Sequence, residues 1–255
     1  MTELIRADIL LTELGLAPSR TAAQSYIAGG RVHLLEAGRR TLVSKPSQKL
    51  LADAQLEVAA DPADRYVSRG GLKLAGALAE TGLDVTGWRC LDVGISTGGF
   101  CDCLLQAGAA AVVGVDVGHG QLHPTLEADP RVSLFEGINA RALDAAELLA
   151  ANGGQAYDLA VADLSFISLT LVLPAVAPLV RPGGRLLWLV KPQFEVGREG
   201  IAKGGIVRDA SLYEGVRLKV TQSAQDQGLR LDAWLDSPIA GGDGNREFFM
   251  LLTRL

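Results

Sequence analysis

Short apolar segments alternate with helix-like segments between residues 88 and 190, and this alternation constrains the fold more than any other feature. Strands that are apolar on both faces and joined by crossover helices belong to a parallel sheet covered on both sides. The pattern predicts strands at Trp88–Val93, Ala111–Val115, Val132–Phe135, Leu159–Ala162 and Arg185–Val190. Between them it predicts helices at Gly98–Ala107, Leu122–Ala128, Arg141–Ala150 and Ser168–Leu179.

The last part of the chain follows a different pattern. A helix-like segment at residues 209–225 precedes two strand-like runs at residues 229–235 and 247–251, and only a Gly- and Pro-rich connection separates these runs. Strands without an intervening crossover pair antiparallel. We therefore expect an α/β, Rossmann-like sheet that is parallel except for an antiparallel last strand.

A polar, aperiodic stretch near residues 61–68, containing Asp-Pro-Ala-Asp-Arg, interrupts the pattern and indicates a domain boundary. Before it, the sequence predicts helices at residues 6–14 and 20–28, with Ser19 as the cap of the second helix. Strand-like pieces follow at residues 31–35 and 55–58. We expect a small α+β domain at residues 1–60, a linker at 61–68 and a larger α/β domain at 69–255.

The charge balance argues against a protein that coats nucleic acid by bulk charge. The chain has 24 Lys+Arg and 29 Asp+Glu, a net charge of −5. Basic side chains nevertheless gather locally, in residues 31–49, 65–73 and 181–208. Local clusters of this kind can neutralise phosphates.

Neither a membrane span nor a metal site is expected. The longest apolar run, residues 169–180, is too short to cross a bilayer and contains Pro174 and Pro178. The three cysteines are too few for a disulfide framework, and Cys101 and Cys103 point to different faces of a predicted helix. These features predict a cytoplasmic protein without metal.

A glycine-rich loop joins the first strand of the large domain to a helix, in Cys-Leu-Asp-Val-Gly-Ile-Ser-Thr-Gly-Gly-Phe at residues 90–100. Glycines let the backbone approach a ligand, and the helix start offers unpaired N–H groups. Asp116 ends the next strand 22 residues after Gly94, near the spacing of roughly 20 expected for a carboxylate that binds ribose. The loop therefore predicts a cofactor that contains a nucleoside.

Two features favour S-adenosylmethionine over NAD as this cofactor. Ser96 stands where a dinucleotide fingerprint has its second glycine. Asp92, at the strand end, would repel a pyrophosphate but can pair with an amino-acid ammonium group. The antiparallel ending of the sheet points the same way. An NAD-dependent oxidoreductase is the rival enzyme class.

Four charged residues form a candidate reaction site. Asp163 and Lys191 end the fourth and fifth strands, and Glu247 opens the last strand. Lys73 lies on the helix that begins the large domain. Ligands bind beyond the carboxyl ends of parallel strands, and an antiparallel last strand starts at that same edge. A lysine that is desolvated and close to another ammonium can act as a base, so Lys191 could deprotonate a ribose hydroxyl that attacks a methyl group.

The motifs of this chain resemble those of the TlyA family, ribosomal RNA 2′-O-methyltransferases related to the FtsJ group. The resemblance rests on six blocks in order: the glycine loop, Asp-Val-Gly-His-Gly-Gln-Leu (116–122), Ala-Asp-Leu-Ser-Phe-Ile-Ser-Leu, Val-Lys-Pro-Gln-Phe-Glu, Lys-Gly-Gly-Ile-Val-Arg-Asp (203–209) and Gly-Asn-Arg-Glu. The N-terminal Arg-x-Asp, Ser-Arg-x-x-Ala and Gly-Gly-Arg-Val resemble the S-four RNA-binding domain. Ile95 departs from the family pattern, where a small residue is expected, and is predicted to narrow the loop.

The resemblance implies a set of functional residues and partners. The catalytic tetrad would be Lys73, Asp163, Lys191 and Glu247, acting on a cytidine 2′-hydroxyl of ribosomal RNA in a ribosomal subunit. The residues implied for S-adenosylmethionine are Asp92, Gly94, Ser96, Thr97, Gly98, Gly99, Phe100, Asp116, Val117, Asn139 and Asp163. Those implied for RNA are Arg6, Ser19, Arg20, Arg31, Arg65 and Arg69.

Several alternatives stay open at this point. The chain stops soon after the last predicted strand, as in the subtype that modifies the large subunit alone, which suggests 23S rather than also 16S RNA. A non-catalytic RNA-binding factor for ribosome assembly would share the fold but transfer nothing. The sequence shows no basic amphipathic helix, so it gives no support to a membrane-lytic role. Phe166 and Phe194 are candidates either to stack on a displaced nucleotide or to belong to the core.

Overall fold

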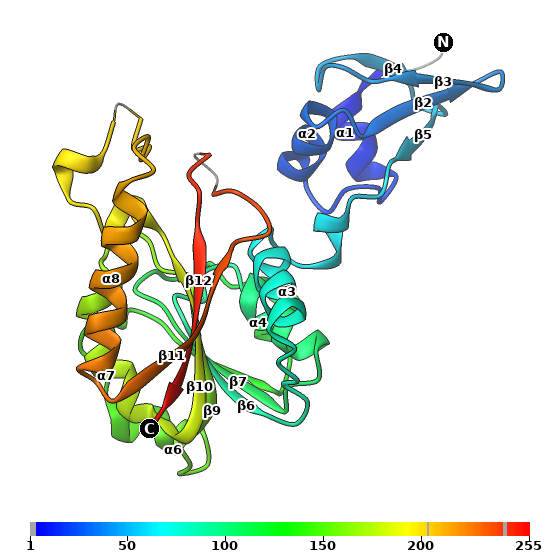
Figure 1. Ribbon diagram of the computed structural model, residues 1–255. Helices are drawn as coiled ribbons and strands as arrows, with labels where there is room; N and C mark the ends of the chain where they lie inside the picture. Colours follow the sequence, from blue (N-terminus) through cyan, green and yellow to red (C-terminus); the bar gives the residue numbers. More distant parts are fainter. Residues whose placement is uncertain (1–3, 203, 242–243) are drawn as a thin grey trace. The chain divides into compact units, whose positions relative to one another are not determined.

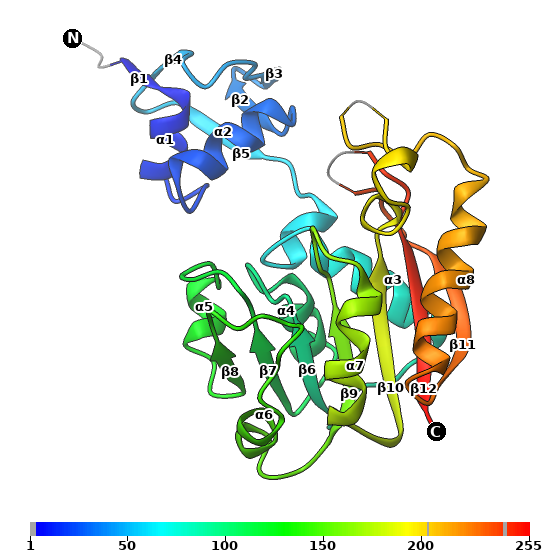
Figure 2. The same ribbon diagram turned by 90° about the vertical axis from the view of Figure 1, so that its left-hand side faces the viewer.

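The computed structural model describes residues 4–202, 204–241 and 244–255. The chain divides into two compact units, residues 1–64 and residues 65–255. Figures 1 and 2 show the elements of each unit. Among the described residues, no helix is both long and apolar enough to cross a membrane.

The first unit is a small α+β structure. Its helices are α1 (Ala7–Glu13) and α2 (Arg20–Ala28), and α2 begins where the Ser19 hydroxyl accepts a hydrogen bond from the Ala22 amide at 3.2 Å. The antiparallel strands are β1 (Leu4–Arg6) with β4 (Lys49–Leu51), and β3 (Arg39–Leu42), β2 (Val32–Glu36) and β5 (Gln55–Val58) in that spatial order. A separate apolar core that includes Leu10, Leu11 and Ile27 joins the helices to the strands.

A buried carboxylate ties the two helices of this unit together. Asp8 is fully buried, and it accepts hydrogen bonds from Arg6 at 2.9 Å, Arg20 at 3.0 Å and Gln24 at 2.9 Å. Bonding to Arg6 is the largest influence on the Asp8 carboxyl and holds its pKa well below the usual value, against the opposing effect of burial. The ionised Asp8 is therefore part of what holds α1 and α2 together.

The second unit contains a seven-stranded sheet in the order β11-β12-β10-β9-β6-β7-β8. Its strands are β6 (Arg89–Val93), β7 (Ala111–Val115), β8 (Val132–Phe135), β9 (Tyr157–Ala162), β10 (Val180–Val190), β11 (Leu229–Asp236) and β12 (Phe248–Arg254). Five strands, β8 to β10 in space, are parallel, while β12 pairs antiparallel with both β10 and β11. The predicted Rossmann-like sheet with an antiparallel ending is confirmed.

Helices cover both faces of the sheet, as Figure 1 shows. One apolar core lies on the side of α6 (Ala145–Ala151), α7 (Leu173–Val176) and α8 (Leu212–Gln225), and the other on the side of α3 (Gly70–Thr81), α4 (Gly99–Gln106) and α5 (Pro124–Glu127). Along β10, Leu186 and Trp188 face the first core whereas Leu187 and Leu189 face the second. The alternation explains why β10 is apolar at every position from Leu186 to Val190.

The sheet order reverses at β6, because the chain continues outward through β7 and β8 and then returns to place β9 on the other side of β6. Such a switch point leaves a crevice at the carboxyl ends of the strands, where ligands bind in open α/β sheets. The loops after β6 and β9 therefore border the crevice in which a ligand is expected.

The structure corrects the sequence-based prediction at residues 168–179 and at Glu247, and it adds short strands to the first unit. The segment predicted as one helix at residues 168–179 contains only the short α7 between two 3₁₀ turns, Leu169–Leu171 and Ala177–Leu179. Pro174 and Pro178 account for this, since proline lacks the N–H that continues a helix. Glu247 does not open the last strand but immediately precedes it.

We predict that Asp8→Asn weakens the first unit by about 2 kcal/mol at neutral pH, because it removes a charged acceptor from three donors. Amide hydrogen exchange in α1 and α2 of the full chain measures this. Since folding lowers the pKa of Asp8, its stabilising effect is present above the unfolded pKa of about 4 and is lost as the pH falls below it.

The control for this prediction is Asp53→Asn, which changes an exposed carboxylate of the same unit. We expect Asp53→Asn to leave exchange unchanged. Equal protection in wild type and Asp8→Asn at pH 7 would contradict the structural role of Asp8.

Candidate functional site

The loop between β6 and α4 passes close to the loop after β9, and glycine makes this possible. Gly94 has a φ of 84°, and a Cβ there would lie 2.8 Å from the Leu164 side chain. Gly98 has a φ of 92°, and a Cβ would lie 2.3 Å from Leu126. Both positions therefore exclude larger residues by conformation and by space.

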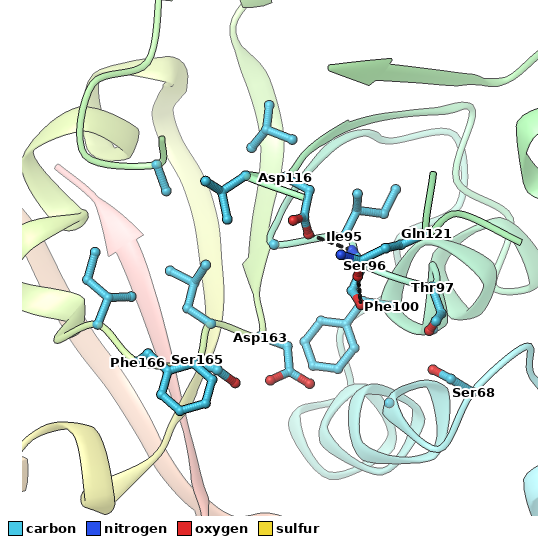
Figure 3. Close-up of a pocket in the computed structure, with 18 of the residues that line it drawn as sticks. Ser68, Ile95, Ser96, Thr97, Phe100, Asp116, Gln121, Asp163, Ser165 and Phe166 are labelled. Atoms are coloured by element: carbon cyan, nitrogen blue, oxygen red, sulfur yellow. Dashed lines mark hydrogen bonds between the residues drawn. The ribbon is translucent and has the colours of Figure 1, made fainter. Parts of the chain in front are cut away.

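The carboxylate of Asp116, just after β7, shapes the other side of this loop. It accepts hydrogen bonds from the Ser96 amide at 2.8 Å and the Gly118 amide at 2.7 Å. Ser96 has a positive φ of 46°, and its hydroxyl donates to Gln121 at 3.0 Å. Figure 3 shows Asp116 and Gln121 converging on Ser96. Asp116 thus holds the loop and still has lone pairs for a ribose hydroxyl.

Asp92 lies buried near the end of β6, and in the part of the chain that the structure describes no cationic side chain is paired with it. Its side chain is 1% exposed, and among the described residues neither oxygen has a partner with good hydrogen-bond geometry. Burial, with a smaller effect of Asp163, raises the pKa of Asp92 to about 8, and the Cys101 amide opposes the rise. A cationic ligand nearby would stabilise the ionised form.

A cavity of about 720 Å³ opens over these loops, within the size range of small-molecule sites. The predicted cofactor residues that line it are Gly94, Ser96, Thr97, Gly99, Phe100, Asp116, Val117, Asn139 and Asp163. Asp92 and Gly98 do not line it: the first lies buried at the strand end, and the second packs against Leu122 and Leu126. The glycine loop, the Asp116 carboxylate beside it and the buried Asp92 carboxylate, which has no side-chain partner among the described residues, fit S-adenosylmethionine, whose sulfonium group is positively charged.

The cavity has lining residues that sequence reasoning missed. They include Ser68, Gly70, Gln121, Ile138 and Leu164. Gln121 belongs to the block at residues 116–122 and was therefore within reach of motif analysis. Ser68 lies just before α3 and Gly70 is its first residue; neither carries a sequence signal of its own.

Ile95 does not narrow the loop as predicted. Its side chain is 3% exposed and packs toward β7, where a Cβ added to Gly114 would lie 2.3 Å from the Ile95 Cδ1. The glycine in β7 provides the space that the larger side chain needs.

Lys191 and Asp163 face each other at the carboxyl ends of β10 and β9. The Lys191 Nζ lies 2.6 Å from Asp163 Oδ1, and these side chains are 11% and 23% exposed. The same Nζ donates a hydrogen bond to Ser165 Oγ at 2.9 Å. An ammonium group, a carboxylate and a hydroxyl therefore meet at the edge of the cofactor cavity.

Lys73 and Glu247 form a second ion pair, more deeply buried. Lys73 Nζ donates to Glu247 Oε2 at 2.6 Å, with side-chain exposures of 11% and 2%. Gly241 allows the fit, because a Cβ there would lie 2.5 Å from Glu247 Oε1. Lys73 is therefore buried against a carboxylate rather than exposed on the surface of its helix.

Residues of both ion pairs line a smaller cavity of about 310 Å³. Lys73, Lys191 and Glu247 line it, and Lys73 and Lys191 also line the larger cavity together with Asp163. The structure thus brings the four predicted residues to one place.

Phe166 lines both cavities and is strongly exposed. It is 91% exposed, with a positive φ of 64° that is unusual for an aromatic residue. Its ring centroid lies 5.2 Å from that of Phe194. Phe166 is therefore not a core residue, and its ring is free to contact a ligand.

A buried carboxylate connects the loops that follow β9 and β10. Glu195 is 6% exposed, and it accepts hydrogen bonds from Ser168 Oγ at 2.6 Å, the Leu169 amide at 2.7 Å and Lys219 Nζ at 3.0 Å. Sequence analysis missed this role of Glu195, although it quoted the residue in a motif. The contact fixes the loop after β9 relative to the loop after β10.

The residues predicted to contact RNA already have partners within the chain. Arg6 and Arg20 bond to Asp8, and Ser19 caps α2. Arg31 stacks on Tyr26, pairs with Asp64 and is only 15% exposed. In the second unit, Arg65 lies over the Tyr66 ring and Arg69 lines the larger cavity.

The cysteines are buried and free, and burial raises the pKa of the Cys103 thiol to about 12. Among the described residues, no group of three or more His, Cys, Asp or Glu side chains is arranged to hold a metal ion.

Comparison with known proteins agrees with this geometry. Residues 66–254 match the FtsJ-like methyltransferase family. A Mycobacterium tuberculosis protein named 16S/23S rRNA (cytidine-2′-O)-methyltransferase TlyA is 42% identical over 252 residues, which are 99% of this chain and 91% of that protein.

Solved structures with a similar fold include two bacterial proteins. A protein described as a candidate hemolysin from Streptococcus thermophilus has a TM-score of 0.75 at 40% identity, over 100% of this chain and 90% of its own. A candidate S-adenosylmethionine-dependent methyltransferase from Listeria monocytogenes, 14% identical with a TM-score of 0.51, shares the fold over 73% of this chain and 98% of its own.

Sequence and structure therefore agree on one enzyme class, with S-adenosylmethionine rather than NAD as the cofactor, and the chain belongs to the FtsJ-like methyltransferase family, among the TlyA proteins.

Proposed function

We propose that this methyltransferase modifies the 2′-hydroxyl of a cytidine in ribosomal RNA. The observation that carries the proposal is the pair of ion pairs, Lys191 with Asp163 and Lys73 with Glu247, that face one cavity beside the cofactor loop. The name of the Mycobacterium tuberculosis relative, an rRNA (cytidine-2′-O)-methyltransferase, supports the choice of substrate.

In the proposed mechanism, Lys191 is the general base. Held beside the glycine loop and Asp116, S-adenosylmethionine would supply an electrophilic methyl group, with its sulfur as the leaving group. Lys191 in its neutral form takes the proton of the 2′-hydroxyl as that oxygen accepts the methyl group. The Asp163 carboxylate lies 2.6 Å from Nζ and stabilises the ammonium group that forms.

The second ion pair has a different role in this mechanism. Lys73 donates to Glu247 and lines the smaller cavity, so it can place a positive charge beside the ribose without losing its partner. Glu247 fixes the Lys73 ammonium in that position. Phe166 and Phe194 are candidates to stack on the target base once it has left its helix.

We also propose that the first unit is an S-four-type RNA-binding domain. Arg20 supports this because its side chain remains 55% exposed while it bonds to Asp8, so one side of the guanidinium is left for phosphate. Arg31 contributes less in this proposal because its guanidinium is already engaged.

The proposed function predicts transfer of tritium from labelled S-adenosylmethionine to ribosomal RNA. The purified protein is incubated with separated 30S and 50S subunits from cells that lack the enzyme. We expect label on 23S RNA, and resistance to alkaline cleavage after one cytidine. Label on 16S RNA as well would show that both subunits are substrates. Label on neither would contradict the proposal and favour an RNA-binding assembly factor.

We predict that Lys191→Ala and Lys191→Arg each lower the rate of methyl transfer by about 100-fold or more, because both remove the general base. Arginine keeps the positive charge next to Asp163 but stays protonated, so it separates the role of charge from that of the base. Binding of S-adenosylmethionine, measured by calorimetry, should stay within about threefold. An active Lys191→Arg variant would show that Lys191 acts through its charge alone.

We predict that Asp116→Asn weakens S-adenosylmethionine binding by about tenfold, because it removes a charged acceptor worth about 1.4 kcal/mol. The transfer rate at saturating cofactor should change much less. Titration calorimetry measures the affinity, and the matched control is Glu127→Gln, an exposed acidic residue of α5. Unchanged affinity in Asp116→Asn would exclude Asp116 from the cofactor site.

A further inference from the structure

The ammonium group of Lys191 has two oxygen neighbours that differ in kind. Asp163 Oδ1 is closer, at 2.6 Å, but among the described residues this oxygen has no partner with acceptable hydrogen-bond angles. Ser165 Oγ, at 2.9 Å, accepts a hydrogen bond with good geometry. Asp163 therefore attracts the Lys191 ammonium group electrostatically, with little preference for its orientation. The hydrogen bond to Ser165 is directional and orients the Lys191 N–H groups.

Direction matters for a lysine that acts as a base. Lysine carries its nitrogen on a flexible four-carbon stem, and its charge alone does not fix where its hydrogens point. In the neutral form the nitrogen has two N–H groups and one lone pair. If one N–H is bonded to Ser165 and Asp163 is the nearest acceptor for the other, the lone pair points to the remaining corner, which is left for the substrate hydroxyl.

The loop that carries Ser165 is held at both ends. Asp163 follows β9, which pairs with β6 and β10 inside the sheet. At the far end, Glu195 accepts hydrogen bonds from Ser168 and Leu169. Ser165 lines both cavities. Figure 3 shows its side chain next to that of Asp163 in the larger one.

We propose that Ser165 is a positioning residue that orients the Lys191 amine toward the ribose 2′-hydroxyl. The inference rests on the proposed function, in which Lys191 is the base. It assigns no proton transfer to Ser165 itself: the serine hydroxyl accepts one lysine N–H before, during and after the reaction, and the proton of the 2′-hydroxyl goes to Lys191.

The test compares Ser165→Ala with Ser165→Thr, which keeps the hydroxyl, and with Ser133→Ala, which removes an exposed hydroxyl from β8. We expect Ser165→Ala to lower the single-turnover rate at saturating substrates by about 10- to 100-fold, the cost of a misplaced reacting group. The KM for RNA and the Kd for S-adenosylmethionine should stay within about threefold, because orientation acts on the transition state.

The threonine variant should recover most of the rate, and Ser133→Ala should match wild type. A wild-type rate in Ser165→Ala would overturn the proposal. So would a threonine variant as slow as the alanine variant, or a loss that lies wholly in KM or Kd.

A second measurement does not need methyl transfer. In protein with ¹³C-labelled lysine Cε, a fixed Lys191 side chain gives two distinct Hε signals. We expect these signals to stay separate in Ser165→Thr and to merge in Ser165→Ala. Unchanged signals in Ser165→Ala would overturn the positioning role. If the wild type transfers nothing to RNA, the proposed function fails, and this spectrum still decides whether Ser165 orients Lys191.

Discussion

The antiparallel pairing of β12 with β10 determines what this sheet can do. A strand that ran parallel in this place would begin at the amino end of the sheet and carry Glu247 to the wrong edge. Because β12 runs in reverse, Phe248 pairs with Val190, and the residues just outside this pair are Glu247 and Lys191. One reversal of strand direction therefore brings Glu247 and Lys191 to the same edge of the sheet.

The site is built from charges that neutralise one another in pairs. Each lysine has a carboxylate 2.6 Å from its Nζ, so the two ammonium groups can lie at one cavity without an uncompensated positive charge. A third carboxylate, Glu195, has no contact with the cavities but fixes the loops that carry Asp163 and Lys191. Positioning here depends on buried carboxylates in loops rather than on the regular elements alone.

Sequence reasoning predicted the large sheet well, because its strands are apolar on both faces and are followed by clear turns; Ala111–Val115 and Val132–Phe135 have the predicted bounds. It missed β1, β3 and β4 of the first unit. Strands β1 and β4 have three residues each, too few to show an alternation, and β3, Arg-Arg-Thr-Leu, is exposed throughout. Motifs located Asp163, Lys191 and Glu247. They could not show that Ser165 bonds to Lys191 or that Gly241 makes room for Glu247, since these contacts depend on how loops distant in sequence meet.

The cofactor cradle and the second ion pair come from different parts of the chain. The loop after β6, Asp116 and Asn139 lie within about fifty consecutive residues, whereas Lys73 must meet a carboxylate 174 positions away. The larger part of the cradle is therefore encoded in one continuous segment, whereas the second ion pair exists only when the first helix of the second unit and the residue before its last strand have been brought together.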